Sequence, residues 1–388
     1  MEVLMDKRKC GGDEIPLLGF GLMRLPRKQG KSFDIDYEAA AELIEHAMSN
    51  GVNYFDTAYT YGGSEEFAGR ALSAYPRGSY YLATKCPPWM INSADDFERI
   101  FSEQQNRCKT DYFDFYLVHN FAQEAKRAAG NKEYFERFGK IGMYDMLMRK
   151  KEEGRIRRIG FSFHGTLDIL RKTLDNYEWD FAQIQLNYVD WKATNAKSQY
   201  ELLNKNNVPV IVMEPLRGGA LAELNEESAA ILKAARPEDS PASWGLRYAA
   251  SLPGVITVLS GMNSMPQLKE NIGTLSGFAS VSEQEKKLLD EAAAVFSKSG
   301  TIACTGCGYC RPCPGGVDIP RVFSIYNHAQ RSGFHIPFDN GYSTLEEREK
   351  ASNCVQCGLC MEKCPQHLAI PEYLREVEKY ASSQGNML

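Results

Sequence analysis

Eight of the eleven cysteines in this 388-residue chain lie between positions 304 and 364, in two groups of four. Two or three residues separate successive cysteines, and a proline follows each group: Cys304, Cys307, Cys310 and Cys313, then Cys354, Cys357, Cys360 and Cys364. Such crowding in a large chain indicates metal ligation rather than disulfides. The second group matches the C-x2-C-x2-C-x3-C-P run of bacterial ferredoxins residue for residue. The spacing therefore predicts two [4Fe–4S] clusters.

The spacing leaves two questions about these ligands open. In two-cluster ferredoxins the cysteine before the proline binds the other cluster, which would place Cys364 with the first three cysteines and Cys313 with the second group. In the first group two residues separate Cys310 from Cys313, whereas the ferredoxin run has three at this point, so this division stays open. Zinc is the alternative metal, because paired CxxC motifs also suit tetrahedral sites.

Four polar residues in the first part of the chain suggest a different chemistry. Asp56, Lys85 and His119 each end a β-rich run, and Tyr61 follows Asp56 in the segment GVNYFDTAYTYGGSE. A tyrosine is a poor acid near neutral pH unless a neighbouring ammonium stabilises its phenolate. Lys85 could supply that charge, Asp56 could orient Lys85, and His119 could hydrogen-bond a carbonyl oxygen. The set would suit hydride delivery to a carbonyl carbon, with Tyr61 protonating the oxygen.

Short strands that alternate with longer helices must position these residues. We expect strands at 17–21, 52–57, 79–85, 112–119, 156–163, 181–187, 208–213 and 254–260. Between them, apolar residues recur three and four apart, as in amphipathic helices. About eight β/α units favour an α/β fold of the TIM-barrel type over an open doubly wound sheet. The strand-ending residues would then lie at the barrel face where such folds build active sites.

The composition changes after Ser297, so we place a domain boundary near Gly300. Residues 1–299 would form the barrel, and 300–388 a small, mainly helical, ferredoxin-like domain. A polar insert at about 120–140 follows the fourth strand and could cover the active-site face.

Composition and charge exclude several classes of protein. The chain is 43% hydrophobic and 24% charged, with a formal net charge of −5, which is typical of a globular protein without a nucleic-acid footprint. It has no apolar run long enough for a membrane span and no signal-peptide core at its start. We therefore expect a cytoplasmic protein that binds neither nucleic acid nor membrane.

From about residue 15 to residue 294 the chain resembles the aldo-keto reductase family, and as a whole it resembles the iron–sulfur subgroup of that family. The resemblance rests on FDTAYTYG with GGSE following, ATK, YLVH, RRIGFSFH, QIQLNY, EPLRGG and LKEN. It implies a catalytic tetrad and a nicotinamide dinucleotide, NADP or NAD, bound without a Rossmann glycine fingerprint. The tetrad would be Asp56, Tyr61, Lys85 and His119. Cofactor contacts would come from Ser162 and Gln183 at the carboxamide, Met213 at the nicotinamide ring, Leu216 and Gly218 along the pyrophosphate, and Glu270 and Asn271 at the adenine end.

Several positions depart from the commonest family pattern. Phe163, with His164 next, stands where an Asn often follows the carboxamide Ser. Met213 stands where an aromatic ring often stacks on the nicotinamide, although a thioether can also pack against a flat ring. Gly261 and Gln267 stand where many NADPH-dependent members carry a Lys and an Arg, so preference for the 2′-phosphate should weaken. Arg217 or Lys269 could substitute for those cations.

Three functions are compatible with these observations. The first is an NAD(P)H-dependent carbonyl reductase or alcohol dehydrogenase whose clusters are structural, redox-sensing or connected to a partner. The second is a reductase in which a ferredoxin or another redox partner feeds electrons through the clusters. The third is a non-catalytic, cofactor-sensing subunit. The complete tetrad favours the first, with a small carbonyl or alcohol substrate bound among loops such as 87–92 and 120–140, where Trp89 and Phe121 lie.

Overall fold

The structure is a computed structural model that describes residues 5–28, 34–121 and 138–384. Contacts divide these residues into two compact units. The first contains the described residues of 1–123, 132–215 and 245–281, and the second contains those of 216–244 and 282–388. The second unit thus includes residues ahead of position 300, and the domain boundary there stays a prediction. Most of the insert expected at 120–140 lies outside the described residues.

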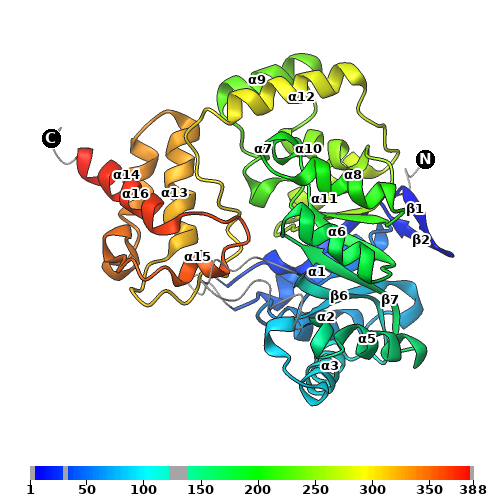
Figure 1. Ribbon diagram of the computed structural model, residues 1–388. Helices are drawn as coiled ribbons and strands as arrows, with labels where there is room; N and C mark the ends of the chain where they lie inside the picture. Colours follow the sequence, from blue (N-terminus) through cyan, green and yellow to red (C-terminus); the bar gives the residue numbers. More distant parts are fainter. Residues whose placement is uncertain (1–4, 29–33, 122–137, 385–388) are drawn as a thin grey trace. The chain divides into compact units, whose positions relative to one another are not determined.

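Eight parallel strands close into a barrel, in the order β10-β3-β4-β5-β6-β7-β8-β9 (Figure 1). The strands are β3 (Leu18–Gly21), β4 (Tyr54–Asp56), β5 (Tyr81–Cys86), β6 (Phe113–Phe121), β7 (Ile156–Phe163), β8 (Phe181–Gln185), β9 (Val210–Met213) and β10 (Val255–Ser260). Each overlaps a run predicted from the sequence, so the TIM-barrel prediction is confirmed. The strands read as apolar runs because helices cover the outside of the barrel and side chains fill its interior.

A short N-terminal hairpin, which the sequence patterning did not predict, closes one end of the barrel. Its strands are β1 (Lys7–Cys10) and β2 (Asp13–Pro16). Cys10 and Ile15 belong to one buried cluster with Tyr54 and Phe181, the first residues of β4 and β8. The hairpin therefore covers the N-terminal ends of these strands.

The helices that accompany the barrel strands have apolar stripes at helical spacing. In α1, Ala40, Leu43, Ile44 and Ala47 are buried, and the side chain of Asp36 accepts a hydrogen bond from the backbone N–H of Ala39 to cap the first turn. The α-helices in this part of the sequence are α1 (Tyr37–Ser49), α2 (Ser64–Leu72), α3 (Ala94–Cys108), α5 (Met143–Glu152), α6 (Leu167–Asn176), α7 (Asp190–Ala193), α8 (Ala196–Lys205), α10 (Pro241–Ala250) and α11 (Met265–Leu275).

The second unit is mainly helical, as predicted for the C-terminal region. It contains α9 (Glu226–Ala235), α12 (Glu283–Phe296), α13 (Ile319–Ser332), α14 (Ile336–Tyr342), α15 (Leu359–Lys363) and α16 (Ile370–Gln384). Helices α9 and α12 lie side by side (Figure 1). The C-terminal helices share an apolar core that includes Val322, Phe323, Leu374 and Val377. Cysteines of both groups belong to or pack against this core, so it positions them.

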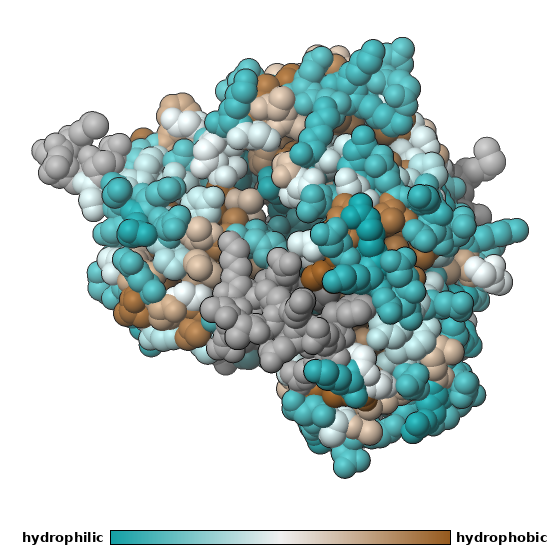
Figure 2. All heavy atoms as spheres, viewed as in Figure 1, coloured by the Kyte–Doolittle hydropathy of each residue, from teal (hydrophilic) through white to brown (hydrophobic). Residues whose placement is uncertain are grey.

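Hydrophilic side chains cover most of the face shown in Figure 2. The large apolar side chains with substantial exposure are Trp89, Met90, Phe334, Ile336, Val355 and Leu359. None of the helices in the described ranges is long and apolar enough to cross a membrane.

Candidate active site and cysteine sites

A buried ion pair lies at the C-terminal ends of β4 and β5. Lys85 Nζ donates hydrogen bonds to Asp56 Oδ1 at 2.5 Å and to the backbone oxygen of Thr57 at 2.8 Å. Lys85 and Asp56 are 1% and 3% exposed. Burial lowers the pKa of Lys85 and raises that of Asp56, and the attraction between the two opposes both effects. The pair places an ammonium, held by one carboxylate oxygen, in a nearly water-free site.

The two remaining predicted catalytic residues lie next to this pair. Lys85 Nζ is 4.7 Å from the centroid of the Tyr61 ring. The Tyr61 and His119 rings meet edge to face, with centroids 5.8 Å apart. Thr60 Oγ1 is 3.4 Å from His119 Nδ1, and the Trp89 ring centroid is 5.4 Å from that of His119. The structure thus brings together all four residues that the sequence singled out.

Burial lowers the pKa of His119 well below its usual 6.5, and the neighbouring charges of Lys85 and His164 act in the same direction. The imidazole is therefore neutral near pH 7. A neutral imidazole has one N–H to donate and one nitrogen that accepts. His119 can accordingly orient a substrate oxygen by a hydrogen bond without carrying a positive charge.

This shift predicts a pH dependence of stability. Because the folded pKa of His119 lies below the unfolded one, the unfolded state binds more protons, and the unfolding free energy declines as pH falls below about 6.5. The His119→Asn variant should show a shallower decline in urea unfolding between roughly pH 7 and pH 5.5. Equal slopes for wild type and the His119 variant would contradict the prediction.

A polar network behind Lys85 escaped the sequence analysis. Glu65, in the first turn of α2 and 1% exposed, accepts hydrogen bonds from Thr84 Oγ1 at 2.6 Å and Gln104 Nε2 at 2.8 Å, and pairs with Arg107 at 3.3 Å. Gln104 Nε2 also lies 3.1 Å from the backbone oxygen of Lys85. The network ties α2 and α3 to the strand that carries the lysine. The only signal of this network in the sequence was Glu65, an acidic residue directly after the Gly-Gly-Ser turn.

Three of the predicted cofactor residues lie on neighbouring strands. Ser162 on β7 is paired in register with Gln183 on β8. Ser162 Oγ accepts the backbone N–H of Asn120 at 2.7 Å, so its own hydroxyl hydrogen can serve another acceptor. Gln183 Nε2 is 3.6 Å from Met213 Sδ, whereas its Oε1 is buried and has no hydrogen-bond partner among the described residues. A buried amide oxygen of this kind fits a ligand that donates an N–H.

The other predicted cofactor residues have different surroundings. Asn271 on α11 is buried and donates from Nδ2 to Ser260 Oγ at 3.0 Å, whereas Glu270 beside it is exposed. Leu216 and Gly218 belong to the second unit, at the short turn η4 (Arg217–Gly219). Their role at the pyrophosphate stays a prediction.

Gly261 and Gln267 stand where many NADPH-dependent members of the family carry a Lys and an Arg, and the structure shows what surrounds each of them. A Cβ on Gly261 would lie 3.0 Å from Cδ of Arg24, whose guanidinium pairs with Glu214 at 2.8 Å. Gln267 Oε1 accepts the backbone N–H of Asn263 at 3.0 Å. A cation therefore lies beside Gly261 even though position 261 itself carries none.

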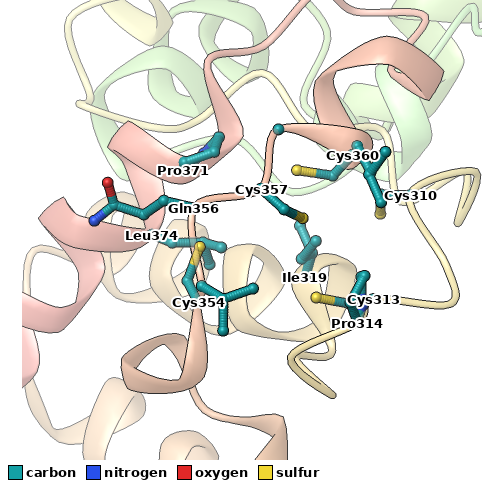
Figure 3. A pocket seen from close by; sticks show the side chains of 13 residues that line it. Cys310, Cys313, Pro314, Ile319, Cys354, Gln356, Cys357, Cys360, Pro371 and Leu374 are labelled. Atoms are coloured by element: carbon teal, nitrogen blue, oxygen red, sulfur yellow. The ribbon is translucent and has the colours of Figure 1, made fainter.

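The eight clustered cysteines line two pockets in the second unit. We call them the inner site and the outer site. The inner site is lined by Cys304, Cys307, Cys310 and Cys364, and the outer site by Cys313, Cys354, Cys357 and Cys360; Cys310 also lines the outer site. Figure 3 shows the sulfur atoms of Cys313, Cys354, Cys357 and Cys360 around a common space next to Ile319.

The cysteine side chains would bind a metal group as thiolates, and their surroundings oppose a thiolate that has no cation beside it. Burial, followed by the neighbouring cysteines, raises the pKa of Cys310 to about 12 and that of Cys360 to about 11. Backbone N–H groups of residues 366–368 hydrogen-bond Cys364 and favour its thiolate, although burial has the larger, opposite effect. In the described ranges, no three His, Cys, Asp or Glu side chains are close enough to hold a single metal ion. The cysteines instead surround larger volumes.

Comparisons with known proteins agree with this architecture. The profile of the aldo/keto reductase family matches residues 17–294, and that of the 4Fe-4S dicluster domain matches residues 303–370. The first match covers more than half of the chain. The chain therefore belongs to the aldo/keto reductase family, and it is an oxidoreductase of that family with a C-terminal 4Fe-4S domain. The zinc alternative has no support from the domain match.

Individual relatives resemble the barrel part of the chain. L-galactose dehydrogenase of Arabidopsis thaliana is 26% identical over 74% of this chain and 92% of that protein. A solved aldo-keto reductase from Bacillus halodurans in its holo form has a TM-score of 0.59 and 24% identity, over 74% of this chain and 96% of the other. An aldo/keto reductase from Klebsiella pneumoniae, solved in complex with NADP and acetate, has a TM-score of 0.59 and 20% identity, over 74% of this chain and 95% of the other. The two solved structures establish likeness of fold.

Proposed function

We propose that this protein transfers a hydride between a nicotinamide dinucleotide, NADP(H) or NAD(H), and a small carbonyl or alcohol substrate. The observation that carries the proposal is the buried Lys85 ammonium, held by Asp56 at 2.5 Å and lying 4.7 Å from the centroid of the Tyr61 ring. This arrangement equips a tyrosine to act as an acid near neutral pH.

The bound dinucleotide would supply the hydride to the carbonyl carbon. Tyr61 gives its phenolic proton to the carbonyl oxygen, and the positive charge of Lys85 stabilises the phenolate that remains. Asp56 holds Lys85 in place, because its Oδ1 accepts a hydrogen bond from the ammonium. Neutral His119, whose ring faces that of Tyr61, orients the substrate oxygen by a hydrogen bond. The near-complete burial of Asp56, Lys85 and His119 strengthens these interactions by excluding water.

The residues present fit a nicotinamide carboxamide. Gln183 Oε1 can accept the amide N–H of the carboxamide, and the Ser162 hydroxyl can donate to its oxygen. In addition, we propose that the inner and outer sites each hold one [4Fe–4S] cluster, which is the cysteine division typical of two-cluster ferredoxins.

The Gln183→Leu variant should bind NADPH about tenfold more weakly, because the carboxamide N–H would lose its acceptor in a buried site. Isothermal titration of NADPH into the anaerobic protein measures this change. Tyr188→Phe is the matched control, since it also removes a buried oxygen that has no partner in the described structure. Equal affinities for the two variants would argue against the carboxamide contact.

A reductase fed by a one-electron partner is the second candidate. The outer site favours it: Cys357 is exposed, and Val355 and Leu359 beside it are 64% and 39% exposed. A partner could approach a cluster there. Because a hydride carries two electrons and a [4Fe–4S] cluster passes one, exchange with a nicotinamide would need a two-to-one-electron junction such as a flavin.

One experiment tests both candidates. The anaerobically purified protein, with its iron and sulfide quantified, is mixed with NADPH or NADH and a panel of carbonyl compounds. Aldoses belong in the panel, since an NAD(P)H-dependent D-xylose reductase is among the relatives. They are also tested with NADP+ and NAD+, since L-galactose dehydrogenase and D-arabinose 1-dehydrogenase are further relatives. Substrate-dependent oxidation of the dinucleotide supports the first proposal. Turnover only with reduced ferredoxin supports the second. Reduction of the clusters by NADPH, as strong in EPR spectra as that by dithionite, would instead show that dinucleotide and clusters exchange electrons through a two-to-one-electron junction.

A further inference from the structure

A second buried carboxylate, that of Glu65, lies behind the strand that carries Lys85. Glu65 is 1% exposed. Thr84 precedes Lys85 in β5, and successive side chains of a strand point to opposite faces. Because the Glu65 carboxylate accepts a hydrogen bond from Thr84 Oγ1, it meets the face of β5 opposite to the one that carries the lysine.

The packing of two helices fixes this position. Glu65 lies in the first turn of α2, where a negative charge is favourable. One turn later, a Cβ on Gly69 would lie 2.1 Å from the backbone oxygen of Arg107 in α3, so the two backbones approach this closely only because residue 69 lacks a Cβ. The close approach brings Gln104 and Arg107 to the Glu65 carboxylate.

The network reaches the candidate active site through the backbone oxygen of Lys85. That oxygen accepts the backbone N–H of Tyr59 at 3.3 Å and lies 3.1 Å from Gln104 Nε2. Tyr59 lies two residues before the proposed acid, and the centroid of its ring is 4.2 Å from Cζ of Arg107. Glu65 therefore orders, through Gln104 and Arg107, both the lysine and the segment that leads to the tyrosine.

Glu65 also acts on the lysine by its charge. Burial lowers the pKa of Lys85, and the charges of Asp56 and Glu65 oppose this effect. Burial raises the pKa of Glu65 as well, whereas its hydrogen bonds and the Arg107 guanidinium favour the carboxylate. Burial also raises the pKa of Cys86 to about 12 and that of Tyr116 well above its usual 10, so both stay neutral. The remaining ionisable groups near Lys85 are Tyr61, His119 and, behind Glu65, Arg107.

We propose that Glu65 is a positioning residue for the reaction: it supports the Lys85 ammonium from behind β5, through the network that it anchors and through its own charge. The inference rests on the proposed function, in which that ammonium stabilises the Tyr61 phenolate. Without the Glu65 charge, Lys85 loses its proton at a lower pH, and carbonyl reduction declines there. A purely structural pair of Glu65 with Arg107 would hold the helices together and leave the ionisation of Lys85 unchanged.

Glu66 allows a matched test. It is the next residue of α2 and also pairs with Arg107, at 3.3 Å, but its side chain is 49% exposed. The NMR resonance of the Lys85 Cε carbon, assigned by its absence in Lys85→Arg, reports the pH midpoint at which the lysine titrates. In the Glu65→Gln holoprotein this midpoint should fall by about half a pH unit or more, and the alkaline limb of kcat/KM for carbonyl reduction should move with it. Glu66→Gln should keep both at their wild-type values. Equal midpoints in the two variants would overturn the inference.

A second pair of variants keeps the test decisive if Glu65→Gln does not fold, since that variant leaves Arg107 without its most buried partner. Arg107→Gln and the double variant Glu65→Gln/Arg107→Gln differ only in the Glu65 charge, so the Lys85 midpoint should be lower in the double variant. Equal midpoints in this pair would also overturn the inference. A wild-type protein that reduces no carbonyl compound with either dinucleotide would overturn the proposed function, whereas the Lys85 midpoints decide the role of Glu65 independently of turnover.

Discussion

Replacing Tyr61 by Phe should lower kcat for carbonyl reduction by ~10²- to 10⁴-fold, the contribution typical of a general acid. The variant loses the phenolic proton and keeps the ring that packs against His119, so its structure and its affinity for NADPH should remain close to wild type. The measurement is kcat and the NADPH dissociation constant on the same anaerobic preparation, with the carbonyl compound that the wild type reduces fastest.

Tyr59 supplies the control for this result. Its hydroxyl donates to Glu103 Oε2 at 2.6 Å, and its ring lies under the guanidinium of Arg107. Tyr59→Phe should therefore leave kcat within about threefold of wild type, as expected for a variant that removes one hydrogen bond away from the reacting atoms. Unchanged kcat in Tyr61→Phe would remove the tyrosine from the mechanism. A wild-type protein that binds NADPH and turns over none of the substrates would instead favour a cofactor-sensing role.

Replacing Lys85 by Met should have the largest effect on the barrel. The variant would leave Asp56 buried without its cation, which typically lowers the free energy of unfolding by about 3–5 kcal/mol. It would also remove the charge that stabilises the Tyr61 phenolate, so kcat should fall at least as far as in Tyr61→Phe. Urea unfolding followed by circular dichroism measures the first effect, and steady-state kinetics the second.

A double variant separates stability from catalysis. In Asp56→Asn/Lys85→Met neither buried charge remains, so a substantial part of the lost unfolding free energy should return. Activity should stay as low as in Lys85→Met, because the ammonium is still absent. A double variant no more stable than the Lys85 single variant would show that the loss came from packing and not from the uncompensated carboxylate of Asp56.

Local pattern alone determined the barrel and the residues of its candidate site. Parallel strands buried on both faces appear as continuous apolar runs, and β6, from Phe113 to Phe121, is buried at every position. Asp56 is the last residue of β4, and Lys85 is followed in β5 by Cys86 alone. Because both polar residues close apolar runs, the pattern places them at the C-terminal ends of the strands. Cysteine spacing is likewise a local property, because two intervening residues suffice to bring successive thiolates to one centre.

Contacts between distant segments were decided only by the tertiary structure. The hairpin β1–β2 escaped prediction because its strands, KRKC and DEIP, are mostly charged and contain no apolar run. Its place follows from the packing of Cys10 and Ile15 against the barrel interior. The network of Glu65 and Gln104 behind Lys85 depends on how α2 and α3 pack, which no spacing in the sequence records.

The same holds for the features on which the functional inferences depend. The unsatisfied oxygen of Gln183 is visible only once its neighbours are known. Cys364 lines the inner site together with residues of the first cysteine group. Helices α13 and α16 pack together, and Cys364 belongs to the apolar core that they share. Spacing determines which groups can act locally, and three-dimensional packing determines which of them meet.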